Sequence, residues 1–199
     1  MTSPAEPGCA PIQVVLADAN VLYSRVLRDY LLCAAEQEIV SVTWRQSILD
    51  EVTEHLIANL PGFTQQSAAA LTNALSRTFP NAIMEPTRAD YARLVEFTLP
   101  DDDDRAVIAA AVAAEADIIC TNNIKHFPAP VMEQLGFDLL TPDELFVRLI
   151  EVNPKGMIAA HRAAVASHIQ FTDQSTIAAL RKAGATKAAD IMAANLGLG

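Results

Sequence analysis

Acidic and amide side chains stand at four separate places in this chain where they could act together in metal or phosphate chemistry. In chain order they are Asp18 in VVLADANVL, Glu51 in SILDEVTEHL, the run Asp101–Asp104, and the pair Asn122–Asn123 in DIICTNNIKHF. Carboxylates crowded into one cleft cannot all stay ionised without compensation. A hard divalent cation such as Mg²⁺ or Mn²⁺ supplies that compensation, because it prefers oxygen ligands. The pattern therefore indicates a metal-dependent site that cleaves phosphodiester bonds.

Each of these side chains also has an explanation that needs no ligand. Asp18 and Asn20 can bond to the backbone of a turn at a strand end, and Glu51 can lie on a solvated helix face. Asn123 can close a turn of its own. Acids before a helix complement its dipole, at about 0.3–1 kcal/mol each. That effect accounts for one or two acids but not for four in succession at 101–104.

Apolar runs and helical periodicity place these residues on particular elements. The predicted strands are 13–17, 39–42, 81–86, 117–121 and 137–140. The predicted helices are 22–37, a helix capped by Thr43 that ends near Asn59, 64–78, 87–97, 103–115, and one that begins at Thr141-Pro142. This alternation predicts an α/β fold with a parallel sheet. Ligands of such sheets bind beyond the carboxyl ends of the strands, where Asp18 would stand.

The strand signal ends near Val152, and the remaining sequence predicts helices at 157–170, 173–183 and 186–196. The charge changes at the same place: residues 1–150 carry 9 Lys and Arg against 21 Asp and Glu, whereas residues 151–199 carry 5 against 3. The sequence therefore predicts three parts. They are a disordered arm at 1–11, an α/β domain at 12–152 and a helical C-terminal extension at 153–199.

Composition narrows the function classes. A hydrophobic fraction of 51% in 199 residues supports a real core, and a net charge of −10 argues against broad coating of nucleic acid. It leaves a nuclease open, because bound metal supplies local positive charge. The cysteines at 9, 33 and 120 form no metal-ligand spacing and no disulfide framework. We expect a cytoplasmic protein without a signal peptide or a membrane span.

Three segments together resemble the ordered motifs of a known family. They read VVLADANVLYS, SILDEVTEHL and LPDDDDRAVIAAAVAAEADIICTNNIKHFP, and the resemblance covers about residues 13–145. The chain is similar to PIN-domain ribonucleases, and in particular to VapC-type toxins of bacterial toxin–antitoxin pairs. The resemblance implies an α/β/α sandwich with a central parallel sheet, and residues 151–199 resemble the helical extension of some of these toxins.

The resemblance also implies an activity and a set of site residues. The activity is endonucleolytic cleavage of RNA with Mg²⁺ (or Mn²⁺), restrained by a small cognate antitoxin protein. Asp18, Glu51 and Asp104 match the three acidic positions, Asp101 matches an acid often found before the third, and Asn123 stands where the family has Asp or Asn. One departure is His126, which stands where relatives with Asn at that position often carry Asp. One or two metal ions, and a monomer or a homodimer, stay open.

The remaining candidates would contact the substrate or the partner. Asn20 and Thr121 are candidates to orient the acidic cluster or a phosphate, and Arg25, Arg28 and Arg105 are candidate phosphate contacts. We expect an antitoxin helix to cover an apolar groove near Leu22, Val26 and Tyr30. We also expect that Asp18→Asn and Asp104→Asn each remove cleavage at no cost in stability, because each relieves repulsion.

Three alternatives belong to other classes. A non-catalytic PIN-like interaction module would not need Asp18, Glu51 and Asp104 together. A metal-dependent phosphatase with a strand-end nucleophile would want Asp where Asn20 stands. A structural protein that binds Ca²⁺ through 101–104 leaves Asp18 and Glu51 unexplained. RNA cleavage with Mg²⁺, with and without EDTA, separates all three.

Overall fold

The central feature of the fold is a parallel sheet of four strands in the order β2-β1-β3-β4. The computed structural model describes residues 12–99 and 101–198, so the arm predicted at 1–11 lies outside the described residues. The strands are β1 (Gln13–Ala17), β2 (Val40–Thr43), β3 (Ile118–Cys120) and β4 (Asp138–Leu140). All three pairings are parallel, and the expected α/β class is confirmed.

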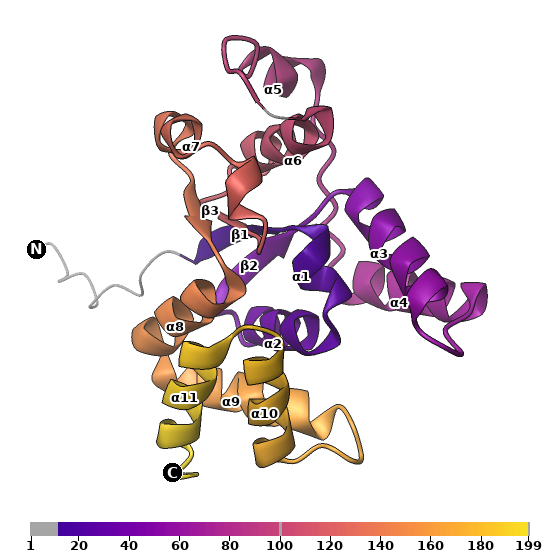
Figure 1. Ribbon diagram of the computed structural model, residues 1–199, viewed down its shortest axis with the longest axis vertical. Helices are drawn as coiled ribbons and strands as arrows, with labels where there is room; N and C mark the ends of the chain where they lie inside the picture. Colours follow the sequence, from indigo (N-terminus) through magenta and orange to yellow (C-terminus); the bar gives the residue numbers. More distant parts are fainter. Residues whose placement is uncertain (1–11, 100, 199) are drawn as a thin grey trace, which may run out of the picture.

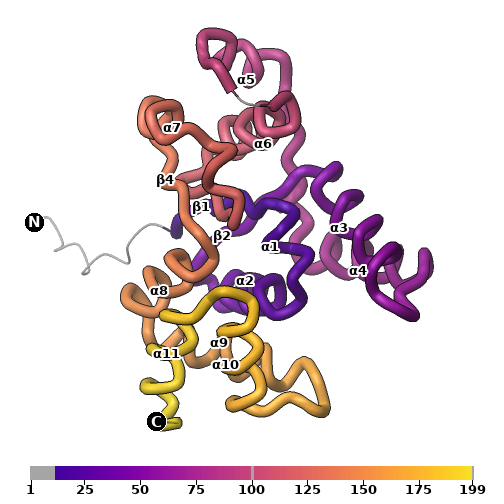
Figure 2. The backbone as a smooth tube through the Cα atoms, in the orientation of Figure 1, coloured from indigo at the N-terminus to yellow at the C-terminus, as the bar shows by residue number. Residues whose placement is uncertain are grey.

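Helices cover both faces of the sheet, as Figures 1 and 2 show. In the first half of the chain they are α1 (Ala19–Tyr23), α2 (Arg25–Glu36), α3 (Gln46–Asn59), α4 (Gln65–Thr78) and α5 (Arg88–Ala92). In the second half they are α6 (Asp102–Ala113), the 3₁₀ turn η1 (Ile124–His126), α7 (Ala129–Leu135), α8 (Pro142–Val152), α9 (Pro154–Ala166), α10 (Asp173–Lys182) and α11 (Thr186–Asn195). With the central sheet they give the expected sandwich with a C-terminal helical region.

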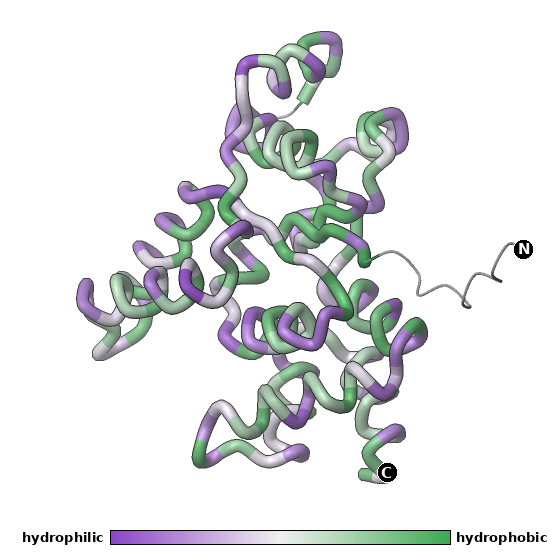
Figure 3. The backbone as a smooth tube through the Cα atoms, turned by 180° about the vertical axis from the view of Figure 1, so that it is seen from behind, coloured by the Kyte–Doolittle hydropathy of each residue, from purple (hydrophilic) through white to green (hydrophobic). Residues whose placement is uncertain are grey.

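The buried side chains of the strands alternate between two apolar clusters, as the two-residue period of a strand requires. Val15 and Ile118 belong to one cluster, which includes α2, α8 and the C-terminal helices. Leu16 and Ile119 face the other cluster, under α6 and α7. In Figure 3 hydrophobic residues follow the central strands, while hydrophilic residues are frequent on the outer turns of the helices. No helix in the described ranges is long and apolar enough to cross a membrane.

Several predicted elements differ from the observed ones. The helix expected at 22–37 is split at Ser24 into α1 and α2. Thr43 ends β2 and donates to the Ala82 carbonyl at 2.8 Å, so Arg45 and not Thr43 caps α3. The strand expected at 81–86 is reduced to one isolated bridge between Trp44 and Ile83. Long-range contacts, rather than local sequence, decided the last two of these points.

The C-terminal helices α9, α10 and α11 pack beneath α2 and α8, on the side of α2 away from the sheet (Figure 1). Their apolar residues join the cluster that contains β1 and α2. The predicted boundary near 152 coincides with the end of α8, but the buried cluster runs across it. Residues 153–198 are therefore a layer of the same core.

This packing corrects the expected position of a partner helix. Leu22 and Tyr30 are fully buried. The ring of Tyr30 contacts His161 of α9 edge-on at 5.8 Å, and its hydroxyl lies 3.3 Å from Nδ1 of His161. The chain's own α9 thus covers Tyr30, and Leu22 lies in the core, whereas Val26 is partly buried and lines a hollow beside α10.

Candidate active site

The register of β1 and β3 brings two predicted site residues together. Ala17 pairs with Cys120, so the residues that follow, Asp18 and Thr121, stand side by side at the carboxyl edge of the sheet. The Asp18 amide donates to the Cys120 carbonyl at 3.1 Å, and the Thr121 amide donates to Leu140 at 3.0 Å. This edge is where parallel sheets place their ligands.

Hydrogen bonds fix the orientation of the Asp18 carboxylate. Asp18 caps the N-terminus of α1, and its Oδ1 accepts from the Ala19 amide at 2.7 Å. Its Oδ2 accepts from the Thr121 hydroxyl at 2.6 Å and from the side-chain amide of Asn20. Thr121 is fully buried. It can therefore influence a substrate only through the residues that it holds.

Asn20 and Thr121 also tie down the loop after β3. The side-chain oxygen of Asn20 accepts from the Asn122 amide at 2.9 Å. The Thr121 hydroxyl accepts from the side-chain amide of Asn20 and from the Asn123 amide, both at 2.9 Å. The polar residues after β1 and β3 form one network, which sets the position of Asn123.

Glu51 reaches the same edge from α3, which lies against α1 (Figure 1). Partial burial raises the pKa of Glu51 above its ordinary value, and the Asp18 carboxylate raises it further. His55, one turn later on α3, opposes this rise. This effect of Asp18 on Glu51 is the like-charge interaction that the sequence pattern predicted.

The acids at 101–104 differ in exposure and hydrogen bonding according to their position at the start of α6. Asp101 caps the helix by accepting from the Asp103 amide at 2.8 Å, whereas the Asp102 side chain is fully exposed. Asp104 is buried, at 9% exposure, and its Oδ2 has no hydrogen-bond partner among the described residues. Nδ1 of His126 lies 3.4 Å from that oxygen, an approach that does not satisfy it as a hydrogen bond.

Burial raises the pKa of the Asp104 carboxyl. Its neighbour His126 lowers the pKa, while the carboxylates of Asp101 and Asp18 raise it again. Apart from His126, no cationic side chain among the described residues lies within 4 Å of the buried carboxylate, and an uncompensated buried charge is costly. That deficiency is the local feature that a bound divalent cation would meet.

A pocket of about 400 Å³ gathers most of the predicted site. Six of the predicted residues line it: Asp18, Asn20, Glu51, Asp101, Asp104 and Asn123. Thr121 lies behind Asp18 in the network just described. The other lining residues are Ala19, Tyr23, Val52, His55, Asp103, Val107, His126 and Phe127. Segments from four distant parts of the sequence therefore converge on one acidic cavity.

The three predicted phosphate-binding arginines lie outside this pocket. Arg28 is buried and donates to the Leu22 carbonyl at 2.7 Å. Arg105 donates to the carbonyls of Leu94 and Phe97 at 2.8 and 3.1 Å. Arg25 contacts His168 and Phe171 near the C-terminal helices. Two of the three are thus engaged with the backbone, and only Arg25 keeps an exposed side chain next to the site.

Tyr23, His55 and His126 are among the pocket residues that were not predicted as site residues. Tyr23 and His55 form an edge-on pair with ring centroids 6.1 Å apart. His126 stands beside Asp104. The spacing of Glu51 and His55, four residues apart on one helix face, was a signal for His55. Tyr23, the last residue of α1, had no local signal, whereas His126, the last residue of η1, had a signal as the departure from the family pattern.

The donor set fits a hard divalent cation in type, although the ligands are not preassembled. Across residues 12–99 and 101–198, no three His, Cys, Asp or Glu side chains lie close enough together to hold a metal ion as they stand. The pocket nevertheless contains carboxylates with raised pKa values and the unpaired oxygen of Asp104. If these side chains moved modestly toward a bound cation, the cation would offset the repulsion between the carboxylates and would pair with the free Asp104 oxygen.

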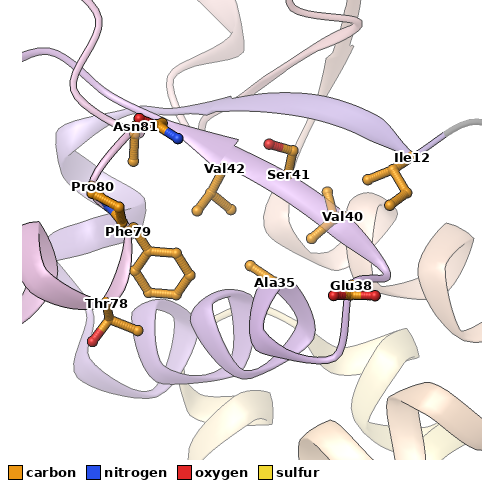
Figure 4. A pocket seen from close by; sticks show the side chains of 11 residues that line it. Ile12, Ala35, Glu38, Val40, Ser41, Val42, Thr78, Phe79, Pro80 and Asn81 are labelled. Carbon is orange, nitrogen blue, oxygen red and sulfur yellow. The ribbon is translucent and has the colours of Figure 1, made fainter.

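Another hollow, of about 360 Å³, lies between β2, the end of α2 and residues 78–82 (Figure 4). Its lining is largely apolar and includes Ile12, Val42 and Phe79, with Glu38 as the one carboxylate of that lining. A single carboxylate does not offer the converging polar groups of a catalytic site. The acidic pocket is the better candidate.

Comparison with known proteins agrees with this geometry. A family model described as "PIN domain" matches residues 14–125, more than half of the chain. The protein named "Putative ribonuclease VapC50" of Mycobacterium tuberculosis (strain ATCC 25618 / H37Rv) is 29% identical over 107 residues, which cover 53% of this chain and 63% of that relative. The match thus spans less than two thirds of the relative's own length. No solved structure gives a significant match.

Proposed function

The chain belongs to the PIN domain family, and from this premise we propose that it is a metal-dependent endoribonuclease, the toxin of a toxin–antitoxin pair. The observation that supports this best is the convergence of Asp18, Glu51 and Asp104 from three elements on one pocket. The likeness to a protein named as a ribonuclease favours RNA as the substrate. An interaction module without catalysis would have no need for this cluster.

In this proposal Asp18, Glu51 and Asp104 hold the metal, with Asp101 and Asn123 as further ligands. Mg²⁺ or Mn²⁺ would supply a Lewis acid that makes a water molecule more acidic and offsets negative charge on the scissile phosphate. Asn20 and Thr121 keep Asp18 in a fixed orientation, because each donates to its carboxylate. Without a cation the pocket would repel RNA, so binding should itself depend on metal and salt.

The hydrogen bonds of the Asn20 side chain argue against the phosphatase alternative. Its side-chain amide holds Asp18, and its side-chain oxygen accepts from the Asn122 amide at 2.9 Å. Both polar ends of Asn20 are therefore occupied in maintaining the site. A phosphatase of the class considered above would place a second carboxylate at this position.

The proposed activity is tested with purified protein and a fluorescent single-stranded RNA in Mg²⁺, in Mn²⁺ and in EDTA. We expect cleavage with metal, none in EDTA, and loss of at least about 100-fold in Asp104→Asn, since metal binding contributes several kcal/mol. Asp102→Asn is the matched control, because this neighbouring acid is fully exposed and outside the pocket. Cleavage in EDTA, or an Asp104→Asn variant as active as wild type, would overturn the assignment.

A cognate antitoxin is the proposed partner. Its site would not be at Leu22 or Tyr30, because both side chains are fully buried. Co-expression with the product of the neighbouring gene should yield a complex in which RNA cleavage is suppressed. A neighbouring gene product that neither co-purifies nor inhibits would contradict this part of the proposal.

A further inference from the structure

Two adjoining hollows lie where the start of α2 meets the C-terminal helices. One, of about 390 Å³, is lined by Ser24, Arg25, Val26, Phe171, Ala179, Lys182 and Ala183. The other, of about 460 Å³, is lined by Arg25 and residues 167–171. Arg25 and Phe171 belong to both linings and so form the wall between them. The lining residues, within 24–26 and 167–183, are far apart in sequence. The hollows therefore form only because the C-terminal helices pack against α2.

Arg25 and Phe171, which separate the two hollows, are held in place by neighbouring side chains. The Arg25 guanidinium carbon lies 5.6 Å from the centroid of the Phe171 ring, and the His168 ring centroid lies 4.6 Å from it. Arg25 also contacts the two His168 ring nitrogens at 2.7 and 2.6 Å and approaches Asp29 at 3.7 Å. Side chains already held in place lose less conformational entropy when a ligand binds.

The charge of the first hollow is opposite to that of the acidic pocket. Arg25 and Lys182 line it, and no carboxylate does. Within the described residues, neighbouring Arg181 pairs with Asp190 at 2.8 Å, whereas Lys182 forms no ion pair. In a chain with net charge −10, this is a local site where phosphate is favoured. The lining is otherwise apolar, as a surface for a base requires.

The hollow adjoins the acidic pocket along the backbone. Tyr23 lines the acidic pocket, and the next two residues, Ser24 and Arg25, line the hollow. Consecutive Cα atoms are only about 3.8 Å apart. A polymer with one phosphate in the acidic pocket would pass over this junction. Tyr23 and His55 at the pocket, and Phe171 beyond it, offer ring surfaces along that path.

We propose that the hollow between Phe171, Arg25 and Lys182 binds one nucleotide of the single-stranded RNA that enters the acidic pocket. The base lies against the Phe171 ring, and the flanking phosphates meet Arg25 and Lys182. This subsite rests on the proposed ribonuclease function. Alternating stacking surfaces and cations are how proteins bind single strands without reading sequence. A helix from a protein partner would not need two cations at the rim.

Binding and cleavage are measured separately to test the subsite. Anisotropy of a labelled single-stranded RNA of about ten nucleotides is followed in Mg²⁺ with the Asp104→Asn protein, which should not cut it. Adding Phe171→Ala should raise Kd roughly 5- to 100-fold, whereas Phe171→Trp should keep it within twofold. Lys182→Gln should lower the slope of log K against log salt by about 0.7. Lys155→Gln, an exposed cation that lines neither hollow, is the control and should change neither quantity.

The outcomes distinguish the two proposals. If wild type shows neither RNA binding nor metal-dependent cleavage, the ribonuclease function fails and the subsite with it. If wild type cleaves RNA but Phe171→Ala and Lys182→Gln bind like their parent, only the subsite is overturned. If these variants keep RNA affinity but lose the co-purified antitoxin, the hollow is a protein-binding surface instead. Thermal melts verify that each variant is folded.

Discussion

Asp18 and Asp104 carry the same functional group in opposite surroundings. Asp18 accepts from the Ala19 amide, the Thr121 hydroxyl and the Asn20 side chain. Asp104 is buried with one oxygen unpaired, and burial raises its pKa. Both oxygens of Asp18 thus accept hydrogen bonds, whereas one oxygen of Asp104 has no hydrogen-bond partner among the described residues. Asp18→Asn and Asp104→Asn should therefore change the free energy of unfolding by different amounts.

At the residue scale we predict that Asp104→Asn keeps or raises Tm in metal-free buffer, by up to about 3 °C. Asp18→Asn should instead lower the free energy of unfolding by about 1.5–3 kcal/mol. The amide nitrogen of Asn would face N–H and O–H donors from which the Asp18 carboxylate now accepts hydrogen bonds. Both variants should lose RNA cleavage. Calorimetry in EDTA measures the contrast, and equal Tm changes for the two variants would contradict it.

Thr121 permits a second residue-scale prediction. Its buried hydroxyl bonds to Asp18, Asn20 and the Asn123 amide. Thr121→Val keeps the shape and removes the hydroxyl, so we expect a loss of about 1–3 kcal/mol in stability and a lower cleavage rate. Thr121→Ser, which keeps the hydroxyl, is the control. Activity at the wild-type level in Thr121→Val would show that the network does not position Asp18.

At the scale of elements, α8 joins the sheet to the C-terminal helices, and its start is fixed by a capping box. The Thr141 hydroxyl accepts from the Glu144 amide at 3.3 Å, and Glu144 accepts from the Thr141 amide at 2.9 Å. The backbone and hydroxyl bonds from Thr141 lower the pKa of Glu144. Stability from this carboxylate is therefore present at neutral pH and is lost as pH falls through its folded-state pKa.

We predict that Glu144→Ala lowers the free energy of unfolding by about 1 kcal/mol at pH 7. The difference from wild type should shrink when both proteins are measured near pH 3, because wild type has then lost the charged cap. Urea titrations at the two pH values provide the test. A difference that is constant with pH would show that the carboxylate charge is irrelevant to the cap.

At the scale of the whole molecule, His161 connects the C-terminal helices to the core. It is fully buried, with Nε2 3.2 Å from Asp173 and Nδ1 3.3 Å from the Tyr30 hydroxyl. Burial lowers the pKa of His161, although Asp173 opposes this and Arg162 adds to it. Between the folded and unfolded pKa values the unfolded chain binds more protons. Stability from a neutral His161 is thus lost as pH falls below its unfolded value.

We expect wild type to lose up to about 1.4 kcal/mol per pH unit on acidification below pH ~6.5 through this residue. His161→Phe should be less stable at pH 7.5 but should show a smaller loss between pH 7.5 and 5.5. His55→Asn, on the exposed rim of the pocket, is the control. Equal pH slopes in wild type and His161→Phe would exclude His161 as the source.

The shared core also predicts cooperative unfolding. Leu180 of α10 is fully buried in the same cluster as Trp44, the single tryptophan of the chain. Leu180→Ala should lower the free energy of unfolding by about 2–5 kcal/mol. Trp44 fluorescence and far-ultraviolet dichroism should then report the same shifted midpoint. An unshifted Trp44 transition would mean that the C-terminal helices unfold as a separate unit. For the same reason, deletion of residues 153–199 would expose Tyr30 and Phe146.

The sequence alone determined the features that depend on local chemistry. The apolar run Gln13–Ala17 before Asp18 gave β1 with its observed limits, and Thr141-Pro142 gave the observed start of α8. Caps, turns and strand ends are specified by neighbouring residues, so local reasoning finds them. The resemblance of three segments to known motifs predicted the family, and the strand-end position of Asp18 indicated where an acidic site would lie.

Tertiary structure decided what depends on long-range contacts. Pairing of Trp44 with Ile83 replaced a predicted strand, and the packing of α1 and η1 brought Tyr23 and His126 into the pocket. Docking of α9 and α10 buried the face of α2 that the sequence left open and created the hollow beside Arg25. A helical sequence shows that a face is apolar but not what will cover it. The covering segment is selected by the free energy of burying apolar surface over the whole molecule.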